Sequence, residues 1–190
     1  MSENTAENQE FNNVNFSEAP IKIKEFDCCT FTNCSFASTD LSGIQFIECE
    51  FTNCNLSMAI LNNTSFKDIR FSSCKILGVN FTDCNPFLLD FNFADCLLNL
   101  SSFYQLKLKG ITFSSCQLQE VDFTECDLTN ARFYHSDLGR AIFENTIIEK
   151  ADFRTAMSYS INPEINYIRK ARFSTDGISG LLDNYDIDIE

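Results

Sequence analysis

The sequence predicts an all-β solenoid of quadrilateral cross-section, about eight coils long, that ends in a short C-terminal helical cap. Three observations carry this prediction. Phenylalanine recurs every 20 residues with a single two-residue slip, every fifth residue is apolar, and nearly all cysteines share one position of the five-residue unit. The 20-residue series consists of Phe11, Phe31, Phe51, Phe71, Phe93, Phe113, Phe133, Phe153 and Phe173.

The five-residue period defines the sides of the coil. Every fifth residue from Phe11 to Phe81, and again from Leu88 to Phe153, is Phe, Leu or Ile. A helix requires a period of 3.6 and a strand a period of 2, so neither explains the pattern. Self-similarity at a fixed period indicates a solenoid. Four units fill one 20-residue echo, so each coil has four sides, and equivalent residues lie about 4.8 Å apart along the axis.

The ends of the chain differ from its middle. Residues 1–10 lack the five-residue period and are predicted to be a polar N-terminal tail. The solenoid proper is expected over residues 11–157, and residues 158–190 are predicted to form a final irregular coil and a C-terminal cap. A helix capped by Ser174 and a strand over residues 185–190 are expected there. The candidate residues for the cap, or for a dimer contact at this end, are Ile178, Leu181 and Leu182.

The one slip in the period predicts a bulge at residues 82–88. Two extra residues at one corner should leave Phe87 and Leu89 exposed next to Asp90. These apolar side chains could anchor a partner, or the bulge could fold back and bury them. The sequence leaves both interpretations open.

Nine of the ten cysteines lie two residues before a position of the five-residue period, which is Pro86 in the case of Cys84, and Ala and Val also occupy their place in the unit. Cysteine is therefore expected there as a small buried residue, and so many free thiols indicate the cytoplasm. The column of Cys34, Cys54 and Cys74 could hold a metal through thiolates. We favour packed thiols, because the position points inward and no histidine joins it. No cofactor is expected.

Charge and motifs limit the function classes. The net charge of −13 argues against direct binding to nucleic acid or to an anionic membrane, and favours a protein partner with a basic surface. No catalytic or phosphate-binding motif is present, and the single histidine, His135, is predicted to point outward, so no enzyme is expected. Glu48, Asp68 and Asp90 align as an acidic column, either a docking strip or simply solvated charge.

The repeating unit resembles the pentapeptide-repeat family, whose pattern is Ala-Asp/Asn-Leu/Phe-x-x. Residues 151–155 (Ala-Asp-Phe-Arg-Thr) match it outright, and residues 126–130 (Cys-Asp-Leu-Thr-Asn) nearly do. The resemblance covers residues 11 to about 157. It implies a right-handed quadrilateral β-helix that works as a non-enzymatic protein-binding module.

The family includes a quinolone-resistance type of acidic dimeric rod that resembles B-DNA and binds DNA gyrase or topoisomerase IV. In its sharpest form, the resemblance implies a DNA mimic that modulates quinolone sensitivity and forms a homodimer through its C-terminal end. This chain carries only the bulge at 82–88 where the resistance type has large loops. The alternative is an interaction scaffold for an unrelated protein partner, without DNA mimicry.

Overall fold

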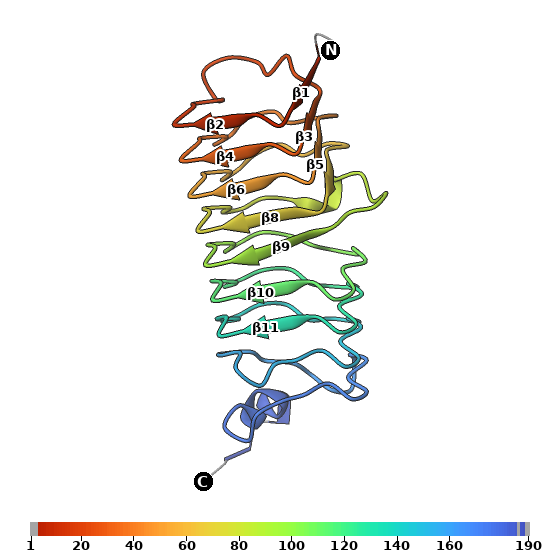
Figure 1. Ribbon diagram of the computed structural model, residues 1–190. Helices are drawn as coiled ribbons and strands as arrows, with labels where there is room; N and C mark the ends of the chain where they lie inside the picture. Colours follow the sequence, from red (N-terminus) through yellow and green to blue (C-terminus); the bar gives the residue numbers. More distant parts are fainter. Residues whose placement is uncertain (1–3, 186, 189–190) are drawn as a thin grey trace.

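The computed structural model describes residues 4–185, 187 and 188. It is a parallel β-solenoid that forms a rod, with the N-terminus at one end and the C-terminus at the other (Figure 1). One face carries a four-stranded sheet in the order β1-β3-β5-β7. Its strands are β1 (Thr5–Glu7), β3 (Glu25–Asp27), β5 (Gln45–Ile47) and β7 (Ser65–Lys67).

A second face carries a seven-stranded sheet in the order β11-β10-β9-β8-β6-β4-β2. Its strands are β2 (Glu10–Asn12), β4 (Thr30–Thr32), β6 (Glu50–Thr52), β8 (Ile69–Ser72), β9 (Phe91–Ala94), β10 (Thr112–Ser114) and β11 (Arg132–Tyr134). All pairs are parallel. Phe31 pairs with Phe51, 20 residues on, whereas Phe71 pairs with Phe93 because the extra residues lie between them.

The larger sheet has slightly fewer turns than the sequence predicts. Its seven strands span six turns, against a prediction of about eight. The two coils after β11 are linked by single bridges, Arg132 to Asp152 and Asp152 to Arg172, and therefore contribute no further strands. The remaining faces are also held by isolated parallel bridges, for example Asp122 to Ile142.

The core is a shaft filled by the periodic apolar residues. The nine phenylalanines of the 20-residue series stack in one column, with successive ring centroids 4.6–5.4 Å apart. Rings on neighbouring faces meet edge to face, as Phe31 and Phe36 do at 5.5 Å and 73°. Aromatic rings favour both geometries.

Each side of the coil ends at a corner with a left-handed backbone. The residue two places after the periodic apolar residue has a positive φ, as in Asn33, Asn53 and Ser73, each with φ 54°. Asn and Gly tolerate this region best, and both are common at these corners. The polar position that the sequence places after each apolar residue is therefore where the chain turns.

The N-terminal tail is shorter than predicted. Strand β1 lies inside residues 1–10, where it pairs with β3, and Ala6 is buried above Phe26. Ala6 extends the column of Phe26 by one 20-residue step, but alanine is not among the residues that define the period. The solenoid therefore reaches back to Thr5.

The C-terminal cap consists of two short 3₁₀ helices, η2 (Ile178–Leu181) and η3 (Asp183–Tyr185). Ser174 accepts a hydrogen bond from the Gly177 amide at 3.1 Å but precedes η2 by four residues, so the predicted helix begins later than expected. Part of the strand expected over 185–190 (residues 186, 189 and 190) lies outside the described residues. In the described part of the chain, we find no helix of the length and apolarity that a membrane span requires.

Candidate functional site

The bulge is fastened to the preceding coil at both ends. A short 3₁₀ helix, η1 (Phe81–Asp83), begins it, and the Asn80 side chain accepts a hydrogen bond from the Thr82 amide. The Asn85 amide donates to Thr64 O at 2.8 Å, and the Asp90 amide donates to Phe66 O at 3.0 Å. The segment between these two anchors departs from the regular coil.

The exposed residues of the bulge are not quite the predicted ones. Phe87 and Leu88 are 66% and 63% exposed, whereas Leu89 is half-buried against the core. Leu88 was expected to occupy the shaft as a periodic residue. Instead it sits at a left-handed corner with φ 55°, which turns its side chain outward.

Phe91 fills the volume that Leu88 leaves empty. It lies two residues before Phe93, at the position that elsewhere holds Cys, Ala or Ile, yet it is only 1% exposed. Its ring centroid is 5.2 Å from that of Phe81 and 5.3 Å from that of Phe93. A large residue at a normally small position was the signal in the sequence that could have identified the exchange.

The bulge interrupts the backbone ladder between two coils. In regular coils, the central residue of a side bonds to the preceding coil through both polar groups: the Lys75 amide donates to Cys54 O, and Lys75 O accepts from the Leu56 amide. Asp127 makes the same pair of bonds to residues 106 and 108. Among the described residues, the amide and carbonyl of Lys107 have no backbone partner on the bulge side. The Thr112 amide, likewise, bonds to the Asn92 side chain at 2.9 Å rather than to a carbonyl.

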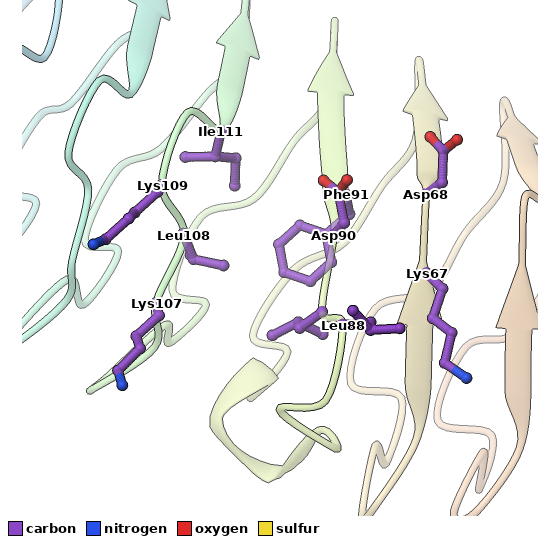
Figure 2. A pocket seen from close by; sticks show the side chains of 10 residues that line it. Lys67, Asp68, Leu88, Asp90, Phe91, Lys107, Leu108, Lys109 and Ile111 are labelled. Carbon is purple, nitrogen blue, oxygen red and sulfur yellow. The ribbon is translucent and has the colours of Figure 1, made fainter.

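A groove of about 630 Å³ opens at this interruption. The exposed Leu88 and the half-buried Leu89 line it, and the buried side chains of Phe91, Leu108 and Ile111 form its floor. Figure 2 shows Lys67 on one side of the groove and Lys107 and Lys109 on the opposite side, with the carboxylates of Asp68 and Asp90 higher in the view. The site therefore combines an apolar floor, an unpaired backbone edge and separated charges.

Two of the rim lysines have identified partners. The Lys67 ammonium lies 5.9 Å from the centroid of the exposed Phe87 ring, a cation–π contact. The Lys109 ammonium lies 3.2 Å from the Asp127 carboxylate. The Lys107 side chain makes no ion pair with the described residues.

The predicted acidic column is present but partly compensated. Glu48, Asp68 and Asp90 are exposed on successive coils. Arg70 contacts Glu50 at 2.9 Å and Asp68 at 3.9 Å. Similar pairs between neighbouring coils join Arg140 to Glu120 and Arg169 to Glu149. Positive charges thus interrupt the negative surface along the rod.

The cysteine column is a hydrogen-bonded ladder. The Cys54 thiol donates to Phe31 O at 3.3 Å, and its sulfur accepts from the Cys34 amide at 3.4 Å. Ser136 occupies the same position of this column four coils after Cys54, with the same pair of bonds. All ten cysteines are free, and only Cys28 is exposed. No cluster of potential metal ligands occurs among the described residues.

Burial makes these thiols weak acids, because desolvation penalises the thiolate. It raises the pKa of Cys49 and of Cys126 to about 12. Thiolate chemistry at neutral pH is therefore disfavoured at both positions.

The cap residues divide between core and surface. Leu181 packs against the end of the core, Leu182 is half-buried and Ile178 is 52% exposed. The Ile161 amide donates to Gly180 O at 2.8 Å, and Gly180 lies so close to Tyr159 that an added Cβ would stand 2.1 Å from Tyr159 O. Glycine is thus required where the cap touches the last coil.

Comparisons with known proteins agree with this architecture. The family model described as Pentapeptide repeat region matches residues 24–87 and 84–153. Two trypsin-treated forms of QnrB1, a plasmid-mediated fluoroquinolone resistance protein, are similar to the chain with TM-scores of 0.62 and 0.61. Each is 15% identical, and the alignments cover 98% of this chain and 97% and 98% of theirs.

HetL, a pentapeptide repeat protein involved in heterocyst differentiation regulation from Nostoc sp. strain PCC 7120, has a TM-score of 0.43 at 15% identity, over 91% of this chain and 87% of HetL. A search of the curated proteins finds no match. At 15% identity, the likeness to QnrB1 shows the fold alone.

Proposed function

The chain belongs to the pentapeptide-repeat family, and on that premise we propose that it is a non-enzymatic, acidic, rod-shaped module that binds other proteins. The observation that carries the proposal is the groove at the bulge, because it is the place where exposed apolar side chains and an unpaired backbone edge coincide. Contiguous exposed apolar surface marks interaction sites. Ten thiols without a disulfide suit the reducing cytoplasm.

The sharper form of the proposal is a DNA mimic that engages DNA gyrase or topoisomerase IV and modulates quinolone sensitivity. Its support is the net charge of −13 and a fold shared with QnrB1 over 98% of the chain. Spread over a rod of roughly 40 Å, this charge amounts to about one per 3 Å, against about one per 1.7 Å for duplex DNA. The electrostatic field around the rod would therefore be weaker than that around duplex DNA.

A supercoiling assay tests the sharper form. Purified chain at micromolar concentration is added to gyrase with and without a quinolone, and the variant Glu48→Gln/Asp68→Gln/Asp90→Gln serves to weaken the acidic column. The proposal expects the wild type to change supercoiling or drug sensitivity, and the variant to do so less. An unchanged reaction at all concentrations would exclude topoisomerase binding while leaving the protein-binding module intact.

The second candidate function is a scaffold for an unrelated protein, and the exposed pair Phe87 and Leu88 favours it. Capture experiments with Phe87→Ala/Leu88→Ala test this alternative. Leu100→Ala is the matched control, because Leu100 has a similar exposure of 64% and φ of 63° on another part of the rod. Loss of a partner with the bulge variant alone supports the scaffold, whereas equal capture by all three forms contradicts it.

A further inference from the structure

The outer surface of the seven-stranded sheet changes sign along the rod. The exposed residue before the central phenylalanine is Glu50 in β6 but Arg132 in β11, and Arg172 occupies the same position two coils after Arg132. Residues 132–172 hold seven of the 14 basic residues of the chain and five of its 27 acidic ones, a net charge of +2 in a chain of −13. This part of the rod is therefore a basic exception on an acidic molecule.

A small basic pocket lies on this surface, beside β11 (Figure 1). Its volume is about 220 Å³, below the roughly 300–1,000 Å³ of pockets for drug-sized ligands. Four cations and one carboxylate line it, which gives it a net charge of +3, and a tyrosine adds a hydroxyl: Arg132, Lys150, Arg154, Arg172, Asp152 and Tyr134. The pocket therefore suits one small anionic group.

The carboxylate of Asp152 is already paired with two of these cations. Arg154 donates to it through Nε at 3.0 Å and through Nη2 at 2.7 Å, and Arg172 Nη1 lies 3.9 Å from Asp152 Oδ2. Asp152 is only 8% exposed. A guanidinium group has five N–H donors, so both arginines keep donors for a further anion. Asp152 thus fixes two guanidinium groups at the pocket, and its own charge is compensated by them.

Arg132 lacks the acidic partner that arginines have elsewhere on the rod. Arg70, for example, contacts Glu50 of the preceding coil at 2.9 Å. At the position in register with Arg132, the preceding coil has Thr112. Among the described residues, neither Arg132 nor Lys150 makes an ion pair. The pocket therefore holds two uncompensated cations, whose charge a bound anion would neutralise.

We propose that this pocket binds the phosphate group of a phosphorylated side chain on a partner protein. A phosphate monoester carries a charge of about −1.5 to −2 at pH 7 and has three strong acceptor oxygens. Planar guanidinium groups donate to such oxygens in pairs, and arginine clusters are a recurrent means of recognising phosphorylated segments. Arg132 supplies the bidentate contact because no other partner competes for it, and Lys150 supplies a second positive charge.

The rest of the rod disfavours an extended polyanion. Residues 1–131 contain seven basic and 17 acidic residues, a net charge of −10, so the neighbouring coils repel a nucleic acid or an anionic membrane. A single phosphate interacts mainly with charges within a Debye length of about 8 Å, where the pocket is positive. The pocket shares no residue with the groove at the bulge, and the proposal depends neither on that groove nor on topoisomerase binding.

An NMR titration of the full chain at physiological salt tests the proposal. The probes are inorganic phosphate, a blocked Ala-phosphoserine-Ala peptide, its unphosphorylated counterpart and a short DNA duplex. The phosphopeptide is expected to shift the amide resonances of residues 132, 152 and 172, and to bind at least roughly tenfold more tightly than the unphosphorylated peptide. Binding of inorganic phosphate or of DNA without binding of the phosphopeptide overturns the assignment to a protein partner, and the absence of any shift at these amides overturns the site.

Substitutions of Arg132 test its role, and its exposure means that they leave the core intact. Arg132→Ala is expected to weaken phosphopeptide binding by roughly tenfold. Arg132→Lys keeps the charge but loses the planar fork, so it should restore only part of the affinity. Arg140→Ala is the matched control, because Arg140 is an exposed arginine that pairs with Glu120 outside the pocket. Equal losses for Arg132→Ala and Arg140→Ala would mean that binding follows overall charge, and would overturn the proposal.

Thr112→Glu provides a test that leaves every residue of the pocket in place. Thr112 lies in register with Arg132 as Glu50 does with Arg70. The new carboxylate is therefore expected to pair with Arg132 and to weaken phosphopeptide binding by a similar factor of roughly ten. Thr112→Gln is the neutral control and should bind the phosphopeptide as the wild type does. If Thr112→Glu also binds like the wild type, Arg132 does not hold the phosphate and the proposal is wrong.

Discussion

The two halves of the rod, before and after the bulge, are built from the same five-residue unit but differ in the strands on their faces. Before the bulge, two faces carry strands of three or four residues, and the face of β3, β5 and β7 is centred on Phe26, Phe46 and Phe66. After it, the same face is centred on Leu108 and Leu128 and is held by single bridges, such as Lys107 to Asp127. The other strand face continues through the bulge without a break.

This difference teaches that a coil can lose one side without losing its place in the stack. Three faces keep their pairing across the slip, as the pairs Phe71 with Phe93 and Asn80 with Ser102 demonstrate. The fourth face opens, and among the described residues the amide and carbonyl of Lys107 have no backbone partner on the bulge side. The bulge is therefore a local opening in a rigid rod rather than a boundary between two domains.

The largest expected effect on stability is at the bulge, where the two halves of the rod meet. Phe91→Ala removes the ring that replaces Leu88 in the shaft, and should lower the free energy of unfolding by about 3–5 kcal/mol. Chemical denaturation measures the change. Leu88→Ala is the control, with an expected change within about 0.5 kcal/mol because that side chain is exposed. Equal losses for both variants would mean that the register at the bulge is misassigned.

The next effect concerns the last coil, where a polar residue replaces the small apolar one. The Asn166 side chain donates to Phe143 O at 2.8 Å and accepts from the Thr146 amide at 2.8 Å. Asn166→Ala leaves both groups unpaired and should cost about 1–3 kcal/mol in denaturation experiments. Asn162→Ala, at a half-buried position nearby, should cost less; a neutral Asn166→Ala would show that water replaces the side chain.

A third expectation is a loss of stability at high pH. The Cys126 thiol has a pKa of about 12 in the folded chain, raised by burial from an ordinary value of 9.0. Above pH 9 the unfolded chain loses this proton while the folded chain keeps it, so the free energy of unfolding falls by about 1.4 kcal/mol per pH unit for this group. Cys126→Ala should flatten the slope, and Val121→Ala, which truncates a buried side chain that does not titrate, should not; identical slopes in all three proteins would contradict the raised pKa of Cys126.

The smallest effect separates the open face from the intact ones. The Lys107 amide should exchange rapidly, while the amides of Lys75 and Asp127 exchange slowly. Hydrogen exchange read by NMR measures all three in one sample. Similar protection at the three amides would mean that the ladder is closed at the bulge.

Most of the fold follows from the sequence because the shaft imposes one rule on every fifth residue. The stacked phenylalanines and the buried cysteines obey that rule, so their positions can be predicted from spacing alone. Exceptions arise where another force decides. Ala6 is buried although it is not one of the large apolar residues that define the period. Asn166 is polar at an inward position, and it is buried there because hydrogen bonds satisfy its side-chain amide.

The slip in the period predicts where the candidate site lies, but the residue spacing does not predict which side chains are buried or which backbone groups are unpaired there. Leu88 and Phe91 cannot both fit in the shaft. The larger Phe91 ring is buried there, and Leu88 is exposed with its backbone in the left-handed region. The unpaired edge at Lys107 belongs to the coil after the slip, whose own sequence is regular. It becomes visible only when two coils are placed side by side.

The fastening of the bulge at Thr64 and Phe66 has a consequence for change in length. Because both ends are pinned to the coil beneath, anything inserted between Asn85 and Asp90 should project sideways without altering the axial repeat. The middle of the rod can therefore accept an inserted recognition loop of any length. The stacked phenylalanines on either side of the insertion would stay in register.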